Sequence, residues 1–263
     1  MTTAIKTDKP TREQILDAAS RLMHVSGYRG TSLDDVLRES GVGKGNFYYY
    51  FKSKEELGYA ILDRIVRGFL ERTLEPSFAD PSLPPLEKIH RFFDSVLESQ
   101  RQRNCVGGCF MGNLASELSD VHEGFRRRLI DVFTRWRERL TEALAEARSD
   151  GSLTSECDPA RLAHFLVASL EGAILMTKVT KEIQVMETCV GELKAHLALY
   201  ATGAPASINP GPVRVRTDGF TAGTRPAQSL GGGIGHRSSL DLARLRRPEP
   251  TGEGRGAEPP SEL

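Results

Sequence analysis

The stretch "GVGKGNFYYYFKSK" occupies residues 41–54 and decides how the first part of the chain folds. It contains three consecutive tyrosines, has lysines on both sides of them and contains no acidic residue. A helix turns by about 100° per residue, so Phe47 and Phe51 would point to one side of a helix running from Lys44 to Tyr50. The opposite side would carry Gly45, Asn46 and Tyr49. The spacing therefore predicts a helix with a buried phenylalanine edge and a polar, aromatic outer face.

Three interpretations of this stretch compete. A phosphate-binding glycine loop follows a strand and opens a helix, whereas this G-x-G-x-G follows a short helical segment and lacks the Walker spacing. A buried aromatic cluster would hide the tyrosines, since aromatic side chains are often half-buried. A surface that contacts DNA would expose the tyrosines beside local positive charge. The amphipathic phase, the glycine turn and the lysines together favour the surface that contacts DNA.

The flanking residues predict a helix-turn-helix. Ser32 with Asp35 forms a capping box that opens a short helix ending at Gly41. Ser53 with Glu56 caps the next, longer helix, which is expected to last until Pro76. Two short helices joined by a tight glycine-containing turn are the geometry of the helix-turn-helix motif. Backbone amides at the helix starts can bind phosphates, assisted by Thr31, Ser32 and Lys54.

The rest of the chain to residue 200 has helical periodicity, and no stretch alternates as a strand should. Thr11 with Gln14 predicts a capping box for the first helix, and Gly27 its end. Later helices are predicted around 86–97, from near Cys109, over 125–144 until Gly151, from Asp158-Pro159 onward, and over 182–200. We therefore expect an all-α protein with a helix-turn-helix domain at 1–53 and a helical domain at 54–200.

Composition changes after residue 200. Residues 201–263 hold 11 of the 25 glycines and 8 of the 14 prolines, which predicts a disordered tail, with a basic arm for DNA as the alternative. The formal net charge is zero, so any basic surface must be local. The start of the chain has no apolar segment typical of a signal peptide, and no apolar run reaches about 18 residues. These features predict a cytoplasmic protein without a membrane span.

The segment from Ile15 to Leu57 resembles the DNA-binding domain of the TetR/AcrR family of transcriptional regulators. It shares G-[FY]-x-x-[TS]-[TS] before the second helix and most of a-G-V-x-[KR]-G-x-[FL]-Y-x-[HY]-F-x-[SN]-K-E-x-L after it. Ser40 stands where the family has alanine, and Gly43 stands where it has serine or alanine, so one hydroxyl contact is missing. The resemblance implies DNA contacts from Thr31, Ser32, Lys44, Gly45, Asn46, Tyr48, Tyr49, Tyr50 and Lys54.

The same resemblance implies a fold and a set of partners. Residues beyond 54 would form a ligand-sensing and dimerisation domain, and the last two helices of each subunit would pair into a four-helix bundle. The apolar stripe through Leu162, Phe165, Gly172 and Met176 suits either core or interface. The expected partners are a double-stranded DNA operator, a small-molecule effector and a second copy of the chain.

Two cysteines, Cys105 and Cys109, stand beside a glycine pair in "GGCFMGNLASELSDV", where Cys109 is the cysteine (residues 107–121). C-x₃-C without nearby histidines is a poor zinc motif, so neither metal nor cofactor is expected. Cys109 is either a small buried apolar residue or a reactive thiol whose pKa is lowered at a helix start. The segment also resembles the electrophile-sensing branch of the family, the N-ethylmaleimide reductase repressor-like regulators. That resemblance implies sensing by Cys109, with Lys178 beside it and Cys105 as a candidate resolving partner. Similar segments in related members sense other ligands.

A cysteine-nucleophile enzyme and a structural DNA-binding protein are the two alternative classes of function. An enzyme with Cys109 as nucleophile would need a paired base, and the sequence shows none, nor a G-x-S-x-G or H-E-x-x-H motif. A ligand-independent structural DNA-binding protein would not need the helical second half. The sequence therefore favours a one-component transcriptional regulator, a repressor rather than an enzyme.

Overall fold

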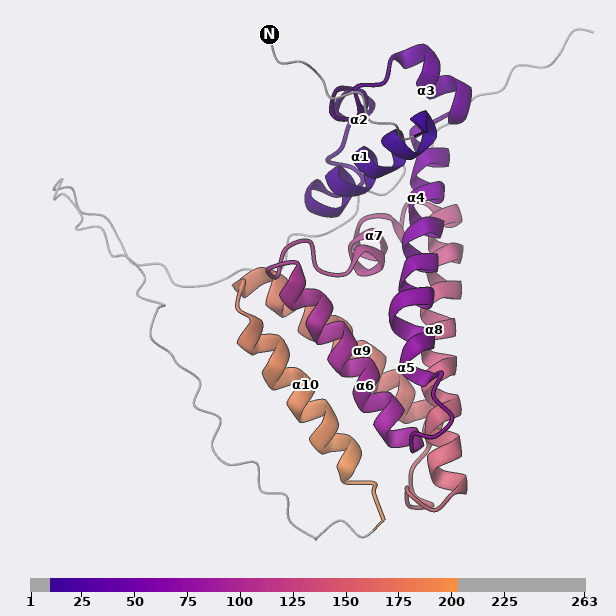
Figure 1. The fold of residues 1–263 in the computed structure, drawn as a ribbon, viewed down its shortest axis with the longest axis vertical. Coiled ribbons are helices and arrows are strands. Elements are labelled where there is room, and N and C mark those ends of the chain that lie inside the picture. Colours follow the sequence, from indigo (N-terminus) through magenta and orange to yellow (C-terminus); the bar gives the residue numbers. More distant parts are fainter. Residues whose placement is uncertain (1–9, 203–263) are drawn as a thin grey trace, which may run out of the picture. The chain divides into compact units, whose positions relative to one another are not determined.

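The computed structural model describes residues 10–202, so the predicted tail lies almost wholly outside the described residues. The described part is built from helices, with one isolated bridge between Leu153 and Ala201 as its only extended pairing. Figure 1 shows the order of the helices. They are α1 (Thr11–Ser26), α2 (Leu33–Ser40), α3 (Lys44–Tyr50), α4 (Lys54–Phe69), the π-helix η1 (Leu70–Leu74), α5 (Glu75–Phe78), α6 (Pro85–Gln102), α7 (Phe110–Leu118), α8 (Glu123–Ser149), α9 (Pro159–Thr180) and α10 (Ile183–Ala198). The all-α prediction is confirmed.

Most predicted helix ends carry the expected cap. Ser32 and Asp35 form a complete capping box, and Gly41 ends α2 with a φ of 66°, a left-handed conformation that favours glycine. Asp158 accepts backbone hydrogen bonds at the start of α9. The capping box predicted at Thr11 is wrong, because α1 starts after Pro10 and has no side-chain cap. Proline suits that position because its fixed φ is compatible with a helix start.

The helix predicted to run from residue 54 to Pro76 is divided. A π-helical segment, Leu70–Leu74, follows α4, and the short α5 continues to Phe78. The wide turn ends at Leu74, two residues before Pro76, which lacks the N–H that an α-helical hydrogen bond needs. Periodicity alone did not show this widening because the apolar spacing continues across it.

Two hydrophobic cores hold the described residues together. The first joins Phe47 and Phe51 of the DNA-binding part to Phe110 of α7 and Phe125 of α8. The second surrounds Trp136 and is built by α6, α8, α9 and α10. The helix-turn-helix is thus packed directly onto α7 and α8, and it shares its core with them.

Helix α9 is long and apolar enough by composition to cross a membrane, with a mean hydropathy of 1.4 over its most apolar window. About 44% of that window is buried inside this chain, as in the core helix of a globular domain. A single helix of this kind is weak evidence for a span.

Candidate nucleic-acid interface and sensor cavity

Helix α3 presents the predicted outer face. Phe47 is fully buried, whereas Tyr49 is 77% exposed and Tyr48 42% exposed. Lys44 and Asn46 are exposed on the same short helix. This is a compact ridge of donors and aromatic rings, the shape and chemistry that a DNA major groove accepts.

Gly45 leaves space on this ridge. Beyond its chain neighbours and its own helix backbone, a Cβ built at Gly45 would meet no atom of the described residues within 4 Å. Packing among the described residues therefore does not require glycine at position 45. The lack of a side chain lets another molecule approach the helix backbone closely. Tyr50 is only partly exposed and packs edge-to-face against Tyr49, with ring centroids 4.8 Å apart.

Two residues expected to contact phosphate are engaged within the protein. Thr31 is 1% exposed, and its hydroxyl donates to the Gly27 carbonyl at 2.8 Å. The Ser32 hydroxyl accepts from the Asp35 N–H at 3.1 Å and donates to the Asp35 carboxylate at 2.6 Å. In this conformation the Thr31 side chain is a structural element of the turn, and Ser32 is first of all a helix cap.

Lys54 also has a partner inside the protein. Its ammonium lies 4.5 Å from the centre of the Tyr28 ring, a cation–π contact, and burial lowers its pKa below the usual value. Lys52, two residues earlier, is exposed. Lys54 therefore stands at the junction of α4 with the α1–α2 connection, where its charge also interacts with Glu117.

The sequence did not indicate how α7 is joined to the DNA-binding part. The Glu117 carboxylate accepts hydrogen bonds from the backbone N–H groups of Tyr28 at 3.2 Å and Arg29 at 2.9 Å. Both N–H groups lie in the connection between α1 and α2. Glu117 looks like a solvated surface residue in the sequence, because its partners are backbone groups almost ninety residues away.

A second contact joins α1 to the glycine turn before Cys109. The His24 ring bonds to the Gly108 carbonyl with Nε2 at 3.2 Å, and burial lowers the His24 pKa below 6.5. A Cβ at Gly107 would lie 2.7 Å from the His24 ring, and Gly107 has a φ of 83°. Both the tight approach and the backbone angle require glycine here. The turn itself is strained, since Asn104 and Cys105 also have positive φ.

Cys109 is the cap of α7, as its place at a predicted helix start suggested. Its sulfur accepts the Gly112 N–H at 3.4 Å. The expectation of a lowered thiol pKa is wrong for this conformation: burial raises the Cys109 pKa well above its usual value, and the nearby Glu171 carboxylate raises it further. The effect of the helix start is smaller than these two.

The other two predicted sensing residues, Lys178 and Cys105, form no hydrogen bond with the Cys109 sulfur. Lys178 donates to the Asn113 side chain at 2.9 Å, and its stem packs against Gly108. Cys105 is buried, and no disulfide joins any of the four cysteines. Two charged groups that the sequence did not indicate interact with the Cys109 thiol: the Glu171 carboxylate of α9, and the Arg103 guanidinium, which lines the same cavity.

Two cavities meet at Cys109 and Glu171. One, of about 240 Å³, extends between α4, α6 and α8 and is lined by aromatic, aliphatic and polar side chains, among them Phe69, Gln100 and Trp136. The other, of about 270 Å³, extends along α7 and α9 to Lys178. Cavities of this size suit a small organic molecule or fragment.

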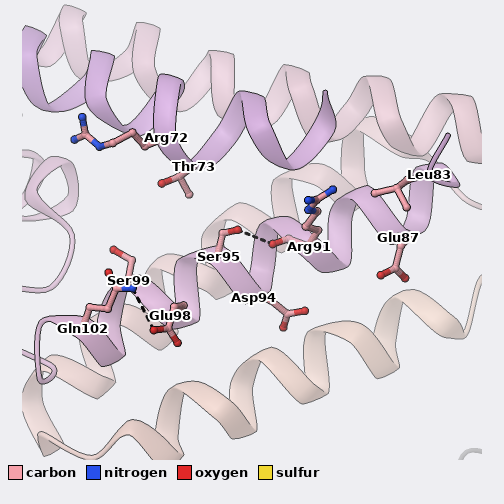
Figure 2. A pocket seen from close by; sticks show the side chains of 10 residues that line it. All are labelled: Arg72, Thr73, Leu83, Glu87, Arg91, Asp94, Ser95, Glu98, Ser99 and Gln102. Atoms are coloured by element: carbon pink, nitrogen blue, oxygen red, sulfur yellow. Dashed lines mark hydrogen bonds between the residues drawn. The ribbon is translucent and has the colours of Figure 1, made fainter. Parts of the chain in front are cut away.

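An open hollow of about 730 Å³ borders the first cavity and shares Arg72, Thr73 and Ser99 with it. Figure 2 shows Arg72 and Thr73 on one helix facing Ser95, Ser99 and the charged residues of α6. The hollow is lined mainly by polar and charged side chains, so it is suited to be the solvent-facing entrance to the cavity at Cys109. No group of three or more histidine, cysteine or acidic residues arranged for a metal ion is found within residues 10–202.

The expected stripe on α9 is divided between core and surface. Leu162, Leu166 and Ala173 are buried in the second core. Phe165 and Met176 are 46% and 51% exposed. Gly172 lies between them with open space at its Cβ position. One face of α9 is therefore apolar and not covered by any other part of residues 10–202.

Comparison with known proteins also identifies a DNA-binding part followed by a separate C-terminal domain. Residues 15–61 match the model for "Bacterial regulatory proteins, tetR family", and residues 85–191 match "Tetracyclin repressor-like, C-terminal domain". The chain is 36% identical over 185 residues to an uncharacterized HTH-type transcriptional regulator in the lacX 3' region of Lactococcus lactis subsp. lactis, covering 70% of this chain and 91% of that protein. It is 30% identical over 172 residues to the HTH-type transcriptional repressor DhaR of Mycobacterium sp. strain GP1, covering 65% and 84%.

A third relative has a solved structure. The chain is 28% identical over 195 residues to the HTH-type transcriptional repressor NemR of Escherichia coli strain K12, covering 74% of this chain and 98% of NemR. It superimposes on the crystal structure of E. coli NemR in its reduced form with a TM-score of 0.64, covering 75% of this chain and 99% of that one. These relatives are regulators of transcription, which agrees with the exposed ridge on α3.

Proposed function

Because this chain belongs to the TetR family of DNA-binding transcriptional regulators, we propose that it is a homodimeric repressor released from its operator by an effector that acts at Cys109. The observation that carries the DNA-binding part is the exposed ridge of α3 above a fully buried Phe47. Lys44, Asn46, Tyr48 and Tyr49 supply donors and aromatic rings for base edges and phosphates. Thr31 and Ser32 contribute through the backbone at the start of α2, and Tyr50 and Lys54 border the contact.

The uncovered apolar face of α9 supports the dimer. Phe165, Met176 and Val179 are 46%, 51% and 68% exposed, which is unusual for a long helix otherwise built into a core. Pairing this face with its copy would bury it around a two-fold axis. Two α3 ridges related by that axis would stand about 34–36 Å apart, one turn of duplex, and fit a pseudo-palindromic operator in the cytoplasm.

The cavities at Cys109 support the effector site. The thiol lies at their junction and belongs to the first turn of α7, and Glu117 of the same helix bonds to the DNA-binding part. Moving a population of dimers from 99:1 to 1:99 takes about 5.5 kcal/mol of preference for one state. A covalent adduct in a packed cavity can supply it by adding volume beneath α7. The likeness to NemR supports a reactive electrophile, with Lys178 and Cys105 as neighbours of the reacting sulfur.

The experiment measures operator release. Fluorescence anisotropy would follow the full chain on the DNA upstream of its own gene, with and without N-ethylmaleimide, for wild type and Cys109→Ser. The proposal expects tight binding by both proteins and release of wild type alone. Equal release of both would point to a non-covalent ligand in the same cavities. A protein that never binds this duplex or any pseudo-palindromic site selected from random DNA would refute the repressor assignment itself.

A further inference from the structure

Cys109 has an acidic partner, and the pair is built into the fold. Glu171 comes from α9, its carboxylate lies against Gly112 in the first turn of α7, and it lines the same two cavities as Cys109. A Cβ at Gly112 would be 2.6 Å from Glu171 Oε2, so a larger residue at this position would displace the carboxylate from its present place. The same Gly112 donates its N–H to the Cys109 sulfur at 3.4 Å. One glycine therefore holds both reacting groups in place.

The carboxylate is poorly satisfied. Glu171 Oε1 is buried and has no hydrogen-bond partner among the described residues. A buried carboxylate oxygen without a partner is costly. Burial raises the Glu171 pKa, which makes this carboxylate a stronger base than an exposed one, and the smaller, opposite effect comes from its hydrogen bond with Cys109. Proton transfer from the thiol would neutralise it.

Other polar atoms in the first cavity also lack partners, which points to a ligand there. Gln100 Oε1 and Trp136 Nε1 are buried, in side chains that are 2% and 1% exposed, and neither atom has a hydrogen-bond partner among the described residues. Both residues line the cavity that contains Cys109 and Glu171. An indole N–H can only donate, so its complement is an acceptor oxygen, such as a carbonyl, on a small molecule.

We propose that Glu171 takes the proton of Cys109 while the sulfur adds to an uncharged conjugated carbonyl compound, and that this class of molecule is the effector. The proposal rests on the sensing role given to Cys109 above. The sulfur forms a bond to the β-carbon, and the carbon–carbon π pair moves to the carbonyl oxygen as an enolate. The thiol proton goes to Glu171, which then returns it to the α-carbon. The sum is addition of S–H across the double bond, so no oxidant or reductant is needed.

If Glu171 only repels the thiolate, its effect on the reaction rate is opposite to that of a base. A negative charge beside a thiol suppresses the thiolate, so a merely repulsive Glu171 would slow the reaction and Glu171→Gln would speed it. A glutamate that accepts the proton makes the reaction faster than the small thiolate population allows. General-base assistance typically contributes 10²- to 10⁴-fold. The direction of the change in Glu171→Gln therefore separates the two roles.

The test follows alkylation of Cys109 by N-ethylmaleimide and by an uncharged enone, using peptide mass mapping of the full chain between pH 6 and 9. We expect wild type to react at a rate that changes little between pH 6.5 and 8. Glu171→Gln should react at least tenfold more slowly at pH 6.5 and gain about tenfold per pH unit, following the thiolate alone. Glu171→Asp should retain the flat profile at a lower rate. Glu138→Gln, an exposed carboxylate on α8, is the matched control, and circular dichroism checks the helical content of each variant.

Reaction of Glu171→Gln at or above the wild-type rate, or the same pH profile in both proteins, would overturn the proposal. Operator binding is measured on the same alkylated samples. If alkylation depends on Glu171 but the adduct still binds the operator, the proposed release fails and the proton transfer stands. If Glu171→Gln is alkylated rapidly and then leaves the operator, the proton transfer fails and the proposed function stands.

Discussion

Replacing Gly45 with alanine should separate the stability of the fold from binding to DNA. Apart from its chain neighbours and its own helix backbone, no atom of residues 10–202 lies within 4 Å of the position that the new methyl group would take, so none of these residues must move. Gly45 is the second residue of a helix, where alanine is the better helix former, so the free energy of unfolding should rise by about 0.5–1 kcal/mol. The methyl group would instead project from the ridge into the space that a bound duplex occupies.

Forcing a methyl group into a close-packed contact typically costs about 1–3 kcal/mol. Operator affinity should therefore fall by roughly 5- to 150-fold, at about 1.4 kcal/mol per factor of ten. Urea unfolding gives the stability, and fluorescence anisotropy at fixed salt gives affinity for the operator and for a scrambled duplex. Gly45→Ala should lose affinity for the operator more than for the scrambled sequence. An unchanged operator affinity would refute the close approach of the α3 backbone to DNA.

Three further outcomes are expected. Tyr49→Ala should weaken operator binding by about 1–3 kcal/mol. It should not lower the unfolding free energy, because Tyr49 is 77% exposed. Unchanged operator binding in the same anisotropy assay would show that Tyr49 is not part of the DNA interface. Gly58→Ala should lower the unfolding free energy by about 1–3 kcal/mol despite the gain in helix propensity. The new Cβ would lie 2.7 Å from the Tyr28 ring and 2.8 Å from the Phe125 ring. A variant that is more stable than wild type in urea would contradict this prediction. Burial lowers the His24 pKa, so between that pKa and 6.5 the unfolded chain binds more protons than the folded chain, and the unfolding free energy decreases as the pH falls. The variant His24→Gln should therefore lose less unfolding free energy than wild type between pH 7.5 and 5.5. Part of the decrease should remain in the variant, because burial also lowers the His90 pKa.

Most of the fold could be predicted because its signals are local. Ser32 with Asp35, Gly41 and Asp158 are caps read from neighbouring residues, and each forms its predicted end. The divided helix after Phe69 could not be predicted from periodicity, since a π-turn inserts one residue without interrupting the apolar pattern. The outward face of α3 was predictable because helix geometry alone determines which way the side chains of its seven residues point.

The sensor cavity was less predictable because its contacts are long-range. Cys109 was identified from the glycine pair before it, but its partner Glu171 lies on another helix, and the sequence does not indicate which residues face each other across two helices. Of the two alternatives for Cys109, the lowered thiol pKa is wrong, because a helix start is visible in the sequence and desolvation is not. Thr31 was assigned to phosphate from its neighbours, whereas its hydroxyl is used by the Gly27 carbonyl.

The bond from Glu117 to the α1–α2 connection bears on how such proteins can be recombined. A chimera that joins residues 1–53 to the body of another regulator would leave the N–H groups of Tyr28 and Arg29 without their carboxylate, and the ring of His24 without its carbonyl. These three contacts come from the few residues of α7 and the turn before it. The transferable unit for building a hybrid regulator is therefore the helix-turn-helix together with residues 107–118, although they are far apart in the chain.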